Sequence, residues 1–163
     1  MKPSSTRTTV AALSLLLAWA GAVQAQTSPA TPAVACAQHQ DMDPAQLYGL
    51  WQLALWPEGG SEAAPLSRGA LLFERHPDYP GSVRGDLRRS GTRQDLLAIV
   101  SGDVTGGEFN LDESADGVTM DAVWSGTPQD CGRVIRGTRR PAEGRPASEP
   151  TFHFLLKKTS DWR

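Results

Sequence analysis

The chain has 163 residues, of which 39% are hydrophobic, and its formal net charge is −2. This length is enough to bury a core and favours one domain over two. The mild negative charge argues against a general nucleic-acid binder, because such a protein needs a basic surface to neutralise phosphates.

Residues 1–25 have the pattern of a cleavable secretory signal peptide. Lys2 and Arg7 precede an apolar run over residues 10–23, and the run ends in the sequence VQA at positions 23–25. The run is shorter than the roughly 20 apolar residues that cross a bilayer. We therefore expect cleavage after Ala25, export to the periplasm or the medium, and no integral membrane segment afterwards. A retained anchor helix is the alternative.

The mature chain is expected to begin with a flexible leader, residues 26–40, followed by a single domain over residues 41–163. The leader is rich in Pro, Thr and Ala and poor in bulky apolar side chains. Without Lys2 and Arg7 the net charge falls to about −4, which favours no particular small ligand.

Cys36 and Cys131 are the two cysteines of the chain, and both lie in its mature part. In an oxidising compartment an even cysteine count predicts a disulfide. This one would close a loop of roughly 95 residues and stabilise the fold by about 4–5 kcal/mol on the chain-entropy model. The alternative is a lipidated Cys36. That requires a cysteine directly after the apolar run, whereas residues 27–32 intervene.

Beyond the leader, a single helical turn and then strands are predicted. Asp43 and Pro44 suit the N-cap and the first position of the turn. From Leu47 onward apolar residues alternate with period two, which is typical of half-buried strands. The predicted strands are 47–55, 69–73, 82–88, 96–102, 108–113, 118–124, 133–138 and 151–157.

The short connections between these strands favour an antiparallel meander. Most contain turn signals such as Pro80-Gly81, Gly106-Gly107 and Asp116-Gly117, and parallel crossovers would need a dozen or more residues. Closing about eight such strands into an up-and-down barrel removes the exposed edges. We therefore predict an all-β barrel whose interior is either filled or holds one small ligand. A two-sheet β-sandwich is the alternative.

The tripeptide Gly49-Leu50-Trp51 in the first strand resembles the Gly-x-Trp of the calycin barrels, the lipocalins and avidins. The resemblance implies that Trp51 plugs one end of the barrel and that a basic residue from a late strand packs over it. Candidates for that basic residue are Arg139, Lys157 and Lys158. The other lipocalin motifs and any equivalent of avidin's biotin contacts are absent, so biotin binding is not implied.

The layout also resembles the periplasmic inhibitors of secreted metalloproteases. Those proteins combine an eight-stranded barrel, one disulfide and an N-terminal trunk that enters the protease cleft. Residues 26–40 would be the trunk, although Cys131 places the disulfide differently. This resemblance implies a protein partner.

No catalytic, cofactor or metal motif is recognised in the sequence. The hairpin at 112–117 copies the first half of a calcium loop but has Val123 where a bidentate Glu is needed, so we interpret it as a turn. The three histidines, His39, His76 and His153, are not at ligand spacing. There is no Gly-x-Ser-x-Gly elbow.

Trp56, Tyr79, Arg84 and Arg136 are the predicted rim of a pocket at the barrel mouth, between the loops at 57–67 and 75–82. The arginines suit an anionic ligand; the alternative is a solvated outer face interleaved with acids. The sequence thus predicts a non-enzymatic barrel that binds a small molecule or envelope component. The alternatives are a protein-interaction module, such as a protease inhibitor, and a structural envelope protein.

Overall fold

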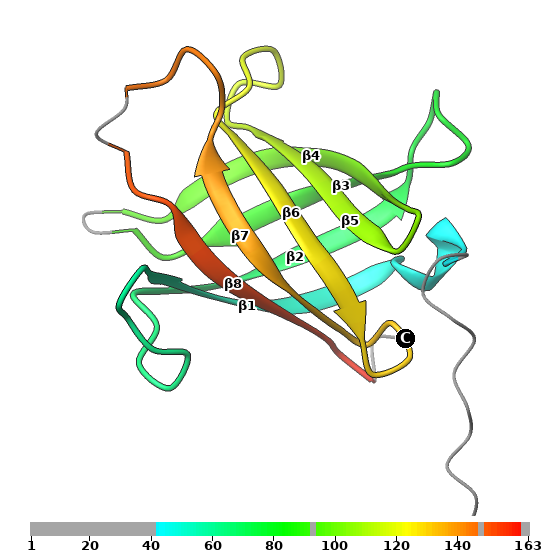
Figure 1. Ribbon diagram of the computed structural model, residues 1–163. Coiled ribbons are helices and arrows are strands. Elements are labelled where there is room, and N and C mark those ends of the chain that lie inside the picture. Colours follow the sequence, from blue (N-terminus) through cyan, green and yellow to red (C-terminus); the bar gives the residue numbers. More distant parts are fainter. Residues whose placement is uncertain (1–41, 92–93, 147–148, 161–163) are drawn as a thin grey trace, which may run out of the picture. The chain divides into compact units, whose positions relative to one another are not determined.

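The computed structural model describes residues 42–91, 94–146 and 149–160, and in them the chain forms a closed barrel of eight antiparallel strands in sequence order (Figure 1). The predicted signal peptide, leader and Cys36 lie outside these residues. The strands are β1 (Gly49–Pro57), β2 (Ser67–Arg75), β3 (Val83–Arg89), β4 (Leu96–Thr105), β5 (Glu108–Ser114), β6 (Ala122–Gln129), β7 (Val134–Pro141) and β8 (Phe152–Lys158).

Pairing between the first and last strands closes the sheet. Trp51 of β1 lies opposite Leu71 of β2 on one side and opposite Lys158 of β8 on the other. Each strand therefore has a neighbour on both sides, and no edge is left to pair with another chain. The predicted up-and-down barrel is confirmed, and the alternative prediction of a two-sheet sandwich is wrong.

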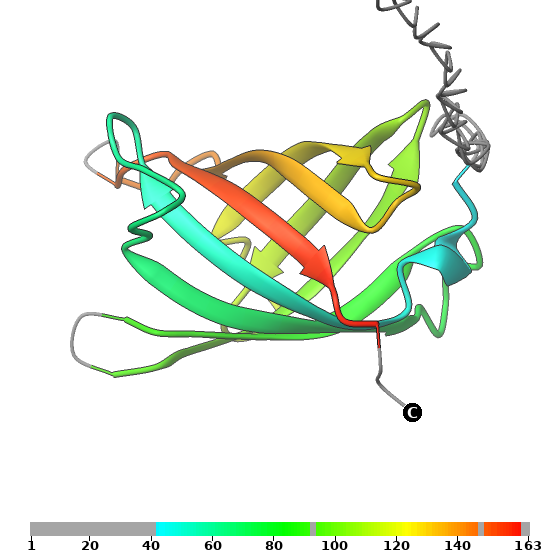
Figure 2. The ribbon, with the colours of Figure 1, turned by 90° about the horizontal axis from the view of Figure 1, so that it is seen from below.

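The connections alternate between the two ends of the barrel, as an up-and-down order requires (Figures 1 and 2). We call the end with the short 3₁₀ helix Pro44–Gln46 the helix end; it also carries the connections at 76–82, 106–107 and 130–133. The opposite end, the loop end, carries the connections that follow β1, β3, β5 and β7, of which residues 58–66, 90–91, 94–95, 115–121, 142–146 and 149–151 are described. The prediction that the 57–67 and 75–82 loops line one mouth of the barrel is therefore wrong, because these loops lie at opposite ends.

The predicted helical turn is confirmed, and because of it the first strand begins at a later residue than predicted. Asp43 Oδ1 accepts a hydrogen bond from Ala45 N (2.8 Å), and Gln46 Oε1 accepts one from Asp43 N (3.1 Å). This capping box holds residues 44–46 in a turn, so β1 begins at Gly49 and not at Leu47. Gly49 has φ +109°, a conformation that a side chain disfavours, where the chain turns into β1.

The sixth strand starts four residues later than the sequence pattern predicts. Asp116 accepts hydrogen bonds from Val118 N (2.8 Å) and Thr119 N (2.6 Å), which commits that segment to a turn. β6 instead runs on through Pro128. The missing N–H of Pro128 is tolerated there because β5 pairs with β6 only as far as Gly126, whereas β7 continues alongside.

Aromatic side chains fill the interior from end to end. Five rings, each at most 1% exposed, form a chain of edge-on and tilted contacts with centroids 5.0–6.3 Å apart. In order they are Trp51, Phe73, Phe109, Phe154 and Trp124. Glycine makes room for them: a Cβ on Gly126 would lie 2.8 Å from Phe154 Cζ. Of the two predicted interiors, the structure shows the filled one.

Candidate functional site

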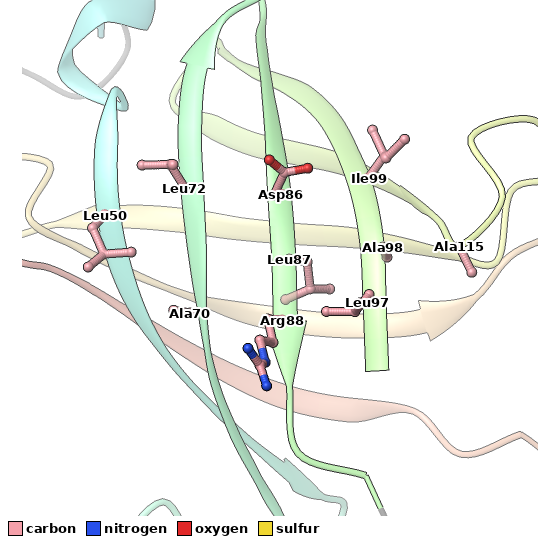
Figure 3. A pocket seen from close by; sticks show the side chains of 10 residues that line it. All are labelled: Leu50, Ala70, Leu72, Asp86, Leu87, Arg88, Leu97, Ala98, Ile99 and Ala115. Carbon is pink, nitrogen blue, oxygen red and sulfur yellow. The ribbon is translucent and has the colours of Figure 1, made fainter. Parts of the chain in front are cut away.

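A mostly apolar hollow lies on the outer wall of the barrel, across β1 to β4 (Figure 3). It has a volume of about 490 Å³, within the range of roughly 300–1,000 Å³ typical of small-molecule sites. Its outward-facing lining includes Leu50, Ala70, Leu72, Leu97, Ile99 and Asp86. We call this hollow the outer groove.

Strand register explains how the outer groove forms. Leu50, Leu72, Asp86 and Ile99 lie side by side on four successive strands, each pair being direct Cα partners. Ala70, Arg88 and Leu97 form the next row. The connection after β5 borders the groove through Ala115. The groove is therefore a strip of outward apolar side chains that contains one carboxylate, Asp86, and one guanidinium, Arg88.

A second apolar strip on the outer wall, unlike the first, is covered by the chain itself. Ala54 and Leu155 face outward on β1 and β8, yet they are only 7% and 6% exposed. The 58–66 loop returns over them, and its Glu62 forms an ion pair with Arg136 of β7. The hydrogen bond from Arg136 holds the pKa of Glu62 below its usual value. Leu97 in the outer groove is by contrast 65% exposed.

At the helix end, Trp51 is completely buried and its indole donates a hydrogen bond to the Leu47 carbonyl (2.7 Å). Of the three basic residues named for the calycin resemblance, Lys158 is the one over this ring, with Nζ 5.6 Å from the centroid. Lys158 also donates to the Gln46 carbonyl. Burial, together with the charge of Arg133, lowers the pKa of Lys158.

At the loop end a charged cluster is buried inside the barrel. Glu113, 5% exposed, accepts hydrogen bonds from Trp124 Nε1 (2.9 Å) and from Arg139 Nε (2.7 Å) and Nη2 (3.1 Å). Arg89 Nη2 lies 3.7 Å from the same carboxylate. This cluster was not predicted from the sequence, although charged residues at the inward positions of alternating strands were its signal. Both Glu113 oxygens are engaged, so we interpret the cluster as structural.

The four predicted rim residues do not converge. Trp56 lies on the outer wall at the loop end, stacked on His153 with centroids 6.1 Å apart. Tyr79 lies at the helix end beside His76. Arg84 faces outward on β3, and Arg136 is paired with Glu62.

Other predicted features can also be placed. The Asp116 hairpin is a turn, because backbone and hydroxyl donors occupy its carboxylate and lower its pKa. Residues 42–91, 94–146 and 149–160 contain no group of three or more His, Cys, Asp or Glu side chains that could hold a metal. They also contain no helix with the length and hydrophobicity that a membrane crossing requires. Cys131 lies in the turn between β6 and β7, and its pairing with Cys36 stays a prediction.

Comparison with known proteins shows the fold and no family. No protein-family model and no curated protein matches the chain. It is similar in structure to a redesigned β-barrel, mFAP1, bound to DFHBI, with TM-score 0.51 and 17% identity over 71% of this chain and 98% of that chain. It is also similar to EF1p2_mFAP2b bound to DFHBI, with TM-score 0.51 and 14% identity over 76% of this chain and 100% of that one.

Replacing Glu113 with Ala is expected to destabilise the fold by about 3–5 kcal/mol, because it leaves the Arg139 guanidinium buried without its counter-charge. Urea unfolding followed by circular dichroism measures the loss. Asn110→Ala, on the exposed face of the same strand, is the matched control and should stay within about 0.5 kcal/mol of the parent. Equal stability of Glu113→Ala and the parent would contradict a structural role for the cluster.

Proposed function

We propose that this chain is an exported, non-catalytic binding protein that holds a small apolar or amphipathic molecule in the outer groove. The observation that carries the proposal is the division of apolar surface in the barrel. Aromatic rings occupy the interior, whereas an apolar hollow of small-molecule size stands open on the outer wall. Ligand sites are typically concave and mostly apolar with a few polar groups, which describes the outer groove.

Two further observations support the outer groove as the binding surface. The 58–66 loop covers the apolar strip on β1 and β8, so the chain protects one outward apolar strip and leaves the other uncovered. Large exposed apolar patches on soluble proteins often mark binding sites. The two structures similar in fold, mFAP1 and EF1p2_mFAP2b, are each bound to DFHBI, so this fold is compatible with ligand binding.

We also propose that the chain is related to the calycin barrels. This relationship is supported by Gly49-Leu50-Trp51 at the start of β1 and by Lys158 over the Trp51 ring. A protease-inhibitor function would depend on residues 26–40, which lie outside the described residues, and no described contact favours it.

The export proposal predicts a definite mass for the protein isolated from its own cells. Cleavage after Ala25 leaves a chain that begins at Gln26, and the Cys36–Cys131 disulfide makes it two hydrogens lighter than its reduced form. Intact-mass spectrometry before and after reduction tests both points. A mass that includes the first 25 residues would refute cleavage, and a mass unchanged by reduction would refute the disulfide.

A groove-filling substitution tests the binding site. In Ala70→Trp the indole occupies the floor of the outer groove, and we expect the affinity for octyl glucoside to fall by about tenfold or more, equivalent to about 1.4 kcal/mol. Isothermal titration calorimetry below the critical micelle concentration measures the affinity.

Thr127→Trp, on the exposed outer wall of β6, is the matched control, because it adds the same side chain outside the groove. It should bind like the parent, and circular dichroism should show that both variants are folded. Equal binding by Ala70→Trp and the parent would place the site elsewhere.

A further inference from the structure

Asp86 is the one charged residue in the row that forms the floor of the outer groove. On its two sides lie Leu72 of β2 and Ile99 of β4, and Leu50 lies beyond Leu72 (Figure 3). A carboxylate between aliphatic side chains is not needed for packing, since the exposed face of a strand accepts many residue types. Its position in the groove therefore bears on what the groove binds.

The Asp86 carboxylate has no charged or hydrogen-bonding side-chain partner within the described part of the protein. No ion pair or side-chain hydrogen bond to Asp86 occurs among residues 42–91, 94–146 and 149–160. Arg88, two residues along the same face, is held instead by Asp95 through Nε (3.0 Å) and Nη2 (2.8 Å). Arg84, two residues the other way, lies opposite Glu74 in the neighbouring strand.

The surroundings of Asp86 change character along the barrel. On one side is the apolar groove, and on the other is a polar hollow of about 350 Å³ whose charged lining, besides Asp86, is Glu74, Arg75 and Arg84. Leu72 and Asp86 line both hollows and form their border. A molecule whose apolar part lies over Leu72 and Ile99 would thus place its polar end beside the Asp86 carboxylate.

From this charge complementarity we infer that the outer groove selects a small amphiphile with a cationic group, and that Asp86 is the residue that recognises the charge. The inference rests on the proposed function, because it names the ligand class of the same groove. An ammonium or amidinium group would pair with the Asp86 carboxylate while the aliphatic part of the ligand displaces water from the leucine and isoleucine side chains. Such a charge-assisted contact strengthens as water leaves the site.

The test compares three amphiphiles that share one octyl chain: octylammonium, octyl glucoside and octyl sulfate. Calorimetry with the mature protein below each critical micelle concentration gives the affinities. We expect the cation to bind about three- to tenfold more tightly than the glucoside. Added salt should remove that advantage, because it screens the pair. The sulfate should bind most weakly.

Two Asp86 variants and one control assign the effect to this residue. Asp86→Asn should abolish the preference for the cation and leave octyl glucoside binding unchanged, and Asp86→Lys should shift the preference to the sulfate. Asp112→Asn removes one negative charge from the outer wall of β5, outside the groove. It should keep the preference, whereas a general attraction of an acidic protein for cations would weaken equally in both Asn variants.

The outcomes separate the inference from the function on which it rests. If octyl glucoside and the cation bind equally, and Asp86→Asn changes neither, charge selection by Asp86 is overturned while the groove remains the binding site. If neither binds, the proposed function is overturned together with the inference. If the sulfate binds best and Asp86→Asn strengthens it, the groove selects anions and Arg88 becomes the recognising residue.

Discussion

The narrow interior of a closed eight-stranded barrel is the constraint on which the rest of this structure depends. Eight strands leave a space that side chains can fill, and here five aromatic rings in contact run through it between the Leu47 end and the Glu113 cluster. Interiors packed in this way are as dense as organic crystals. A ligand that entered would have to displace several of these rings. The surface available to the proposed ligand is therefore the outer wall, where register places Leu50, Leu72 and Ile99 side by side.

The two ends of the barrel are closed by different means. At the helix end, Leu47 and Trp51 are joined by a hydrogen bond, and the Lys158 ammonium lies over the indole. At the loop end, Glu113 holds the Trp124 indole and the Arg139 guanidinium inside the barrel. In both cases a tryptophan N–H finds an acceptor and a cation lies within about 6 Å of the ring. Ligand binding at either end would disrupt these contacts, which stabilise the fold.

Period-two alternation and turn residues predicted the architecture, because a strand with one buried face must alternate and a short connection must join antiparallel neighbours. The sixth strand begins later than predicted, because the side-chain hydrogen bonds of Asp116 are formed only in the folded turn. The outer groove was not predicted, because the predicted pocket lay at a barrel mouth. Its signal was present in Ala70-Leu71-Leu72-Phe73 and Leu96-Leu97-Ala98-Ile99-Val100, where both faces of a strand are apolar. The buried Glu113 was hidden for a different reason: its partners Arg89 and Arg139 lie far from it in sequence and meet it only on closure.

We propose that ligands bind on the outer wall and not inside the barrel. Intermolecular nuclear Overhauser effects between the octyl chain of a bound amphiphile and the methyl and aromatic protons of the protein test it most directly. If ligands bind on the outer wall, the octyl chain will contact the methyl groups of Leu72, Leu97 and Ile99. Contacts to the rings of Phe109, Phe154 or Trp124, which the structure buries, would contradict this proposal.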